Sequence, residues 1–177
     1  MTNADNSGPF YGKYRGIVVQ NIDPESRARL ICTVPDVLGL VPTTWAECCA
    51  PLAGPTGPPM GVYLVPPIGA GVWVEFEQGD PNKPIWTGCR FGLASDLPTL
   101  ALAGLPVSPN IVMQTAGQNT MVISDLPGPT GGIMLKSTTG ASIIVNDTGI
   151  YIQNGRGASI IMTGPTVTIN QGAMVIT

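Results

Sequence analysis

Gly132-Ile133-Met134-Leu135-Lys136-Ser137 returns, 17 residues later, as Gly149-Ile150-Tyr151-Ile152-Gln153-Asn154. After another 17 residues the pattern recurs as Thr166-Val167-Thr168-Ile169-Asn170-Gln171. At the same offset, Ala141-Ser142-Ile143-Ile144-Val145 recurs as Ala158-Ser159-Ile160-Ile161-Met162. Alternating apolar and polar residues bounded by Gly predict short β-strands stacked at a fixed pitch. So few thin repeats cannot bury their own apolar faces, so neighbouring chains are expected to complete the core.

The composition favours an all-β protein with little charge. Hydrophobic types make up 44% of the 177 residues and charged types 11%. A disordered tail would carry more charge and fewer β-branched residues than the segment after residue 110. The 23 Gly and 18 Pro follow no collagen period and predict many turns.

The first half of the chain predicts a different β structure. A long strand over residues 10–22 reaches the turn Asp23-Pro24-Glu25-Ser26 and pairs back over residues 27–34. Further alternating segments, broken by Pro and Gly, continue to residue 92, and no helix is evident. Five or six short strands with one long hairpin predict a small closed barrel, of which the OB-fold is the commonest compact version.

Three parts are therefore expected along the chain. Residues 1–92 form the OB-fold domain. Residues 93–110 form a linker, because this Ala-, Leu- and Pro-rich stretch shows no strand period. Residues 111–177 form the β domain that carries the repeat.

Charge and segment composition exclude several classes of protein. A net charge of −3 and a pI near 4.7 argue against a general nucleic-acid binder, which would present a basic surface. The first residues lack the basic and apolar regions of a secretory signal. The longest apolar stretch, residues 97–107, is interrupted by Pro and Gly and is too short to span a membrane. Synthesis in the cytoplasm, without a signal peptide, is expected.

Catalytic and metal chemistry find little support. The chain has no His, which excludes Ser-His and Cys-His pairs. The cysteines match no zinc spacing and are expected to be buried free thiols: Cys32, Cys48, Cys49 and Cys89. We expect no enzyme activity, no metal and no cofactor.

Two other functions stay open. An OB barrel can bind a glycan or single-stranded nucleic acid, and its candidate residues here are Tyr11, Tyr14, Arg15, Arg27 and Arg29. Six basic residues face eight acidic ones across residues 1–92, which disfavours nucleic acid as a partner. A peptidoglycan hydrolase would need a carboxylate in a cleft, and Glu47 is the candidate.

A set of motifs in residues 10–92 resembles the family of phage baseplate assembly protein V. The matching residues are Tyr11-Gly12-Lys13-Tyr14-Arg15-Gly16-Ile17-Val18, Asp23-Pro24, Arg29-Leu30, Val34-Pro35, Trp45-Ala46, Pro66-Pro67-Ile68-Gly69-Ala70-Gly71-Val72-Trp73-Val74-Glu75-Phe76-Glu77-Gln78-Gly79-Asp80-Pro81 and Lys83-Pro84-Ile85-Trp86-Thr87-Gly88. Their combination is specific, although each piece alone is weak. The segment from Ser137 to Ile152 is similar to the strand repeats in the spike proteins of this family.

The resemblance implies the central spike of a contractile phage tail, an R-type pyocin or an extracellular injection system, and this spike is similar to the VgrG spike of type VI secretion. It implies a homotrimer in which three OB domains form a collar and three C-terminal segments intertwine in one triangular β-helix. The collar would contact baseplate hub and inner-tube proteins and plug the tube. Sheath contraction would drive the needle through the target envelope, a transient contact.

The resemblance also implies roles for single residues. One face of the repeat strands would point to the shared axis and form the trimer core: Ile133, Leu135, Ile143, Val145, Ile150, Ile152, Ile160, Met162, Val167 and Ile169. The chain has no space for an inserted lysozyme domain and no His for an iron-binding tip. A blunt apolar end would need a cap, so a separate PAAR-type tip protein is expected to bind Met174, Val175, Ile176 and Thr177.

Overall fold

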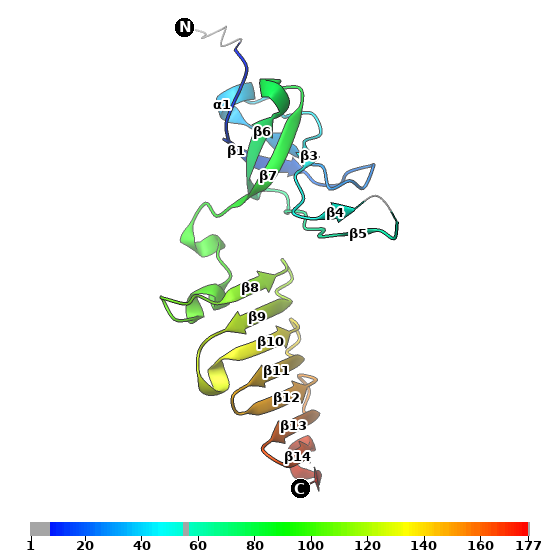
Figure 1. Ribbon diagram of the computed structural model, residues 1–177, viewed down its shortest axis with the longest axis vertical. Helices are drawn as coiled ribbons and strands as arrows, with labels where there is room; N and C mark the ends of the chain where they lie inside the picture. The colour runs from blue at the N-terminus through cyan, green and yellow to red at the C-terminus, as the bar shows by residue number, and fades with distance from the viewer. Residues whose placement is uncertain (1–7, 55–56, 177) are drawn as a thin grey trace. The chain divides into compact units, whose positions relative to one another are not determined.

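The structure, a computed structural model, describes residues 8–54 and 57–176. The chain divides into two compact units, Met1–Gly92 and Leu93–Thr177 (Figure 1). Almost all of its regular structure is β-strand, so the predicted all-β class is confirmed. None of the helices in the described residues has the length and apolar character needed to cross a membrane.

The first unit is built on a five-stranded sheet with the order β2-β1-β6-β7-β3. Its strands are β1 (Tyr14–Gln20), β2 (Ile31–Thr33), β3 (Glu47–Cys48), β6 (Gly71–Phe76) and β7 (Pro84–Arg90). All neighbours are antiparallel except β3 and β7, which are parallel. Leu30, just before β2, exchanges two backbone hydrogen bonds with Ala46, just before β3. These bonds join the two edges of the sheet, which closes as a barrel.

Small elements complete the first unit. They are α1 (Pro35–Leu38), the two-stranded ribbon of β4 (Ala53–Gly54) and β5 (Met60–Gly61), and the 3₁₀ turn η1 (Glu77–Gly79). The expectation of no helix is wrong at α1. Pro35 lies in the first turn of this helix, where its fixed φ and missing N–H are tolerated.

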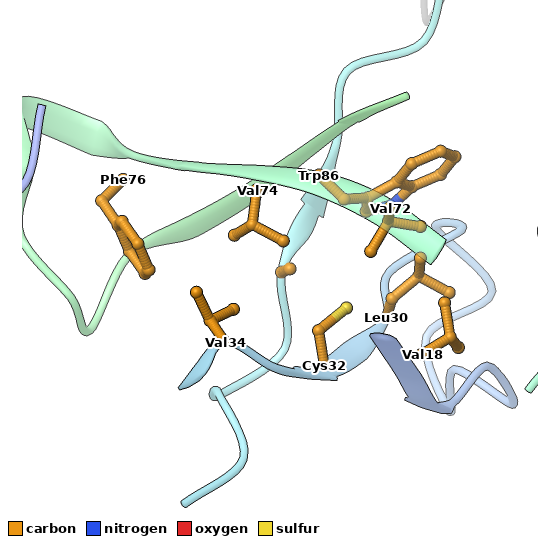
Figure 2. Packing of buried hydrophobic residues seen from close by; sticks show 9 residues of the cluster. Val18, Leu30, Cys32, Val34, Val72, Val74, Phe76 and Trp86 are labelled. Atoms are coloured by element: carbon orange, nitrogen blue, oxygen red, sulfur yellow. The ribbon is translucent and has the colours of Figure 1, made fainter. Parts of the chain in front are cut away.

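The barrel encloses the hydrophobic core. Side chains from β1, β2, β6 and β7 point toward a common interior (Figure 2). The buried residues of this cluster are Val18, Leu30, Cys32, Val34, Ala46, Val72, Val74, Phe76 and Trp86. The Trp86 indole Nε1–H donates to the Ala28 carbonyl at 2.9 Å, so the one polar atom of this side chain is satisfied.

A buried ion pair fixes the predicted turn after β1. Asp23 and Arg29 keep 3% and 10% of their side-chain surface exposed, and Arg29 Nη2 lies 2.7 Å from Asp23 Oδ1. Asp23 also accepts hydrogen bonds from the backbone N–H groups of Glu25 and Arg27. The Arg29 guanidinium lies 5.5 Å from the centre of the Trp45 ring. The hydrogen bonds from Arg29 hold the pKa of Asp23 well below its usual value.

We expect Asp23→Asn to lower the melting temperature at pH 7 and to flatten its fall in acid. A carboxyl with a lowered pKa in the folded state stabilises the fold above about pH 4 and loses that contribution as the pH falls further. The check is thermal unfolding at pH 7 and pH 3. Asp36→Asn, at an exposed carboxyl, is the matched control. Equal pH dependence in wild type and Asp23→Asn would contradict this role.

The second unit is one eight-stranded antiparallel sheet whose strands follow chain order (Figure 1). Its strands are β8 (Ile111–Gln114), β9 (Thr120–Ser124), β10 (Gly132–Lys136), β11 (Ser142–Asn146), β12 (Gly149–Gln153), β13 (Ser159–Thr163), β14 (Thr166–Ile169) and β15 (Met174–Ile176). The 3₁₀ turns of this unit are η2 (Ala94–Asp96), η3 (Thr99–Ala103), η4 (Gly128–Thr130) and η5 (Asn170–Gly172). Each 17-residue repeat therefore contains two strands, which pair within the chain.

Candidate functional site

One face of the second sheet is apolar along its whole length. The strand register aligns side chains in two rows that run through every strand from β8 to β15. The first row is Ile111, Ile123, Ile133, Val145, Ile150, Met162, Val167 and Ile176. The second row is Met113, Met121, Leu135, Ile143, Ile152, Ile160, Ile169 and Met174. We call these two rows together the apolar face.

The apolar face is not covered by any part of the single chain that the structure describes. Leu135 and Ile143, paired across β10 and β11, keep 46% and 43% of their surface exposed. Ile111 at one end keeps 66% and Ile176 at the other keeps 50%. A contiguous apolar surface of this extent is rare on a monomeric protein and marks an interaction site.

The opposite face has a different composition. A single central row of mainly apolar side chains runs between polar ones, and Thr120, Ser124 and Ser142 among the polar residues are buried. Lys136 and Gln153 lie on this second face and are exposed. A half-buried sheet normally exposes its polar face and buries its apolar one, so the exposure of the apolar face here indicates that this face is covered in the assembled protein.

Side chains in the turns hold the register that aligns the rows. Asn154 Oδ1 accepts hydrogen bonds from the backbone N–H groups of Arg156 and Ala158, at 2.8 and 3.1 Å. Asn146 Oδ1 accepts from the N–H groups of Thr148 and Gly149, at 2.9 and 3.2 Å. A shift of one residue would move every apolar side chain to the other face, so these turns determine which face is apolar.

The structure brings together all residues predicted for the trimer core, since each belongs to one of the two rows. Sequence reasoning missed four further members, Ile111, Met113, Met121 and Ile123, which lie outside the 17-residue repeat. Met174 and Ile176, predicted to bind a tip protein, end the two rows on β15. The backbone of Val175 pairs with Thr168, and Thr177 lies outside the described residues.

The charged residues proposed for ligand binding and for hydrolysis form ion pairs with one another and with their neighbours. Arg29 pairs with Asp23 and Glu25, and Arg27 pairs with Glu25 and Glu47 at 3.1 and 2.8 Å. Glu47, the candidate hydrolase carboxylate, is therefore one half of a surface ion pair, with 48% of its side chain exposed.

The aromatic candidates for ligand binding are divided as well. The Tyr14 ring packs against Phe10 and Phe76, with centroids 6.2 and 5.7 Å away. Tyr11 and Arg15 are exposed. The Tyr14 hydroxyl donates to the Tyr11 carbonyl at 3.1 Å, and Arg27 and Arg29 share Glu25, so packing and ion pairs engage most of these side chains.

The cysteines are free thiols, as expected, but only part of the set is buried. Cys32 is fully buried and burial raises its pKa to about 11. Desolvation of the thiol also raises the pKa of Cys48 and, although the residue as a whole is exposed, of Cys89. The expectation that all are buried is wrong for Cys49 and Cys89, which are exposed because they lie at the barrel surface near strand ends.

Comparison with known proteins identifies both units. Residues 14–91 match the family model described as the type VI secretion system/phage-baseplate injector OB domain. Residues 110–175 match the phage baseplate V C-terminal trimerisation domain. No curated protein matches the sequence. The OB fold of the barrel is thus confirmed, and both models describe structural parts of a baseplate assembly. The chain carries these two domains in order and belongs to the phage baseplate V family.

Proposed function

We propose that the protein is the central spike of a contractile injection system, a homotrimer that plugs the inner tube or hub and forms a membrane-piercing needle. The observation that carries this proposal is the apolar face, whose two unbroken rows run through all eight strands and have no cover among the described residues. Three such faces turned toward one axis cover each other completely. The trimer core is then formed by the rows named above.

Strand length supports three walls rather than another number. β10, β11, β12 and β13 each have five residues, and a strand of this length spans about 17 Å. In a three-sided prism of that width each wall lies about 5 Å from the axis, half of the roughly 10 Å between packed sheets. Four such walls would lie about 8 Å from the axis and leave a hollow centre. Three walls therefore give a solid core, and close packing makes the needle rigid.

We expect a chain that ends at Pro109 to lose the trimeric mass and remain a folded barrel. The first unit has its own closed sheet and core, whereas the apolar face lies wholly after residue 110. Light scattering gives the mass, and circular dichroism checks the fold. A trimeric truncated chain would place the main association surface on the barrel and contradict the proposal.

The end of the sheet is proposed to carry a separate PAAR-type tip protein. Met174 and Ile176 keep 53% and 50% of their surface exposed at the last strand, so the two rows end without a cap among the described residues. We expect a purified tip protein of this type to bind the full chain and not a chain that ends before Gly172. Equal binding to both chains, or to neither, would contradict this part of the proposal.

A further inference from the structure

The connecting segment between the two units, residues 93–110, is a folded structure and not a loose linker. It groups with the second unit, and η3 contacts β8. The Ala101 N–H donates to the Pro98 carbonyl at 2.8 Å, and the Ser108 N–H donates to the Leu105 carbonyl at 3.0 Å. Neither family model covers residues 92–109, so nothing in the family match assigns this segment a role.

Two contacts fix the connecting segment to the start of the sheet. Asn110 Nδ2, next to β8, donates to the Leu100 carbonyl at 2.8 Å. Ser108 Oγ donates to Asp125 Oδ2, just after β9. The packing is tight, because a Cβ on Gly104 would lie 2.5 Å from Asn110 Oδ1 and 2.7 Å from its backbone nitrogen. The segment therefore holds one conformation against the sheet.

The connecting segment exposes large apolar side chains in this fixed conformation. Leu102 is 70% exposed, Val107 is 93% exposed and Leu105 is 38% exposed. No charged residue occurs between Asp96 and Asp125. A segment bathed in solvent normally carries charged or polar side chains, so an ordered, uncharged and apolar surface indicates a cover.

The connecting segment lies next to the first strand that carries the apolar face. β8, which η3 contacts, carries Ile111 and Met113, the first members of the two rows. The segment that carries Leu102, Leu105 and Val107 is thus held at the β8 edge of the sheet, beside the first strand of the domain assigned to trimerisation. In a closed three-walled core, a surface that continues the interface meets the neighbouring chain.

We propose that the patch formed by Leu102, Leu105 and Val107 docks on a second copy of this chain, so that the connecting segments close the N-terminal end of the trimer core. This inference rests on the proposed trimer. It extends the association surface beyond the family's trimerisation domain, to residues that sequence patterns assign to a linker.

The first test compares Leu102→Asp and Val107→Asp with the control Thr99→Asp. Thr99 is a polar, exposed residue at the start of η3, so the control adds the same charge to the same turn. Trimer content is followed by light scattering on serial dilution of the full chain. We expect each apolar substitution to raise the concentration at which the trimer dissociates by at least about tenfold, and the control to leave it unchanged.

A second measurement needs no substitution in the patch. Hydroxyl-radical labelling, read by mass spectrometry, compares Leu102 and Val107 in the wild-type trimer with the same residues in the Ile152→Glu chain. Leu30, fully buried in the barrel core, reports that the first unit stays folded. We expect both patch residues to be protected in the trimer and reactive in the separated chain.

The outcomes separate the two proposals. A wild-type trimer in which Leu102 and Val107 stay reactive, or in which all three Asp variants dissociate like wild type, overturns the docking proposal and leaves the spike proposal intact. A wild-type chain that is monomeric overturns the spike proposal. Protection of both residues in the separated chain also overturns the docking proposal, because the cover would then come from the same chain.

Discussion

Replacing Ile152 with Glu is expected to convert the trimer into single chains. Ile152 lies in the second row at the middle of the sheet, paired with Ile143 and Ile160. In the trimer, three copies of this side chain would meet in the closed core. A carboxylate there has no cationic partner on the apolar face, and an unpaired buried charge costs several kcal/mol. Light scattering should give the 18.3 kDa mass of one chain at micromolar concentration.

The neighbouring position supplies a matched control. Gln153 carries the next side chain of β12, points to the opposite face and is exposed. Gln153 Nε2 donates to Ser142 Oγ at 2.9 Å. Gln153→Glu introduces the same group one residue away, and its carboxylate can instead accept from the Ser142 hydroxyl. We expect this variant to remain a trimer. Monomers from both variants would show that added charge alone separates the chains, and trimers from both would exclude the apolar face as the interface.

Replacing Gly132 with Ala is expected to destabilise the second unit by about 3 kcal/mol or more. Gly132 begins β10 with φ of +85°, and a Cβ there would lie 2.0 Å from the Val145 carbonyl oxygen and 2.9 Å from the Asn146 Cα. Both atoms belong to the backbone of β11, so relief requires that the two strands move apart. Denaturant unfolding at fixed protein concentration measures the loss, since trimer stability depends on concentration.

Gly140→Ala is the control that distinguishes the steric clash at Gly132 from the cost of placing Ala at a positive φ. Gly140 has φ of +91°, close to that of Gly132, but the nearest atom to an added Cβ is the Gly155 Cα at 3.7 Å, an ordinary contact. Gly140→Ala should therefore cost only the strain of a left-handed Ala, about 1 kcal/mol. An equal loss of stability in the two variants would contradict the close approach of β10 and β11.

The residues of the candidate site could be predicted from the sequence because strand side chains alternate between faces. Ile133 and Leu135 share a face whichever strand they pair with, and the 17-residue repeat carries that assignment to Ile150 and Ile152. The repeat also contains Gly132 and Gly149, both at strand starts where the next strand approaches closely. The alternation of side chains and the 17-residue repeat are local properties of the chain.

The partner of each strand could not be predicted in the same way. The repeat contains two strands, and periodicity does not tell whether their neighbours come from the same chain or another. The structure decides through short turns, such as the two residues Asp147 and Thr148 between β11 and β12, which force antiparallel pairing within the chain. The sequence places β8 and β9 in the second domain but does not predict their place on the apolar face, because residues 125–131 interrupt the 17-residue period.

The closure of the barrel and the fold of the connecting segment could not be predicted either, because both depend on contacts between separate parts of the chain. The hydrogen bonds between Leu30 and Ala46 close the barrel, and no local pattern predicts which edge residues meet. The connecting segment has no strand period, yet the hydrogen bond from Asn110 and the close packing at Gly104 hold it against the sheet. Contacts of this kind depend on tertiary packing and become visible only in three dimensions.

The solution mass of the purified full chain tests the central claim most directly. Light scattering coupled to size exclusion, over a range of protein concentrations, measures it without a partner or a label. The account predicts a folded species with three times the 18.3 kDa mass of the chain. A folded, soluble species with the mass of one chain at all concentrations would contradict it, because the apolar face would then be stable in water.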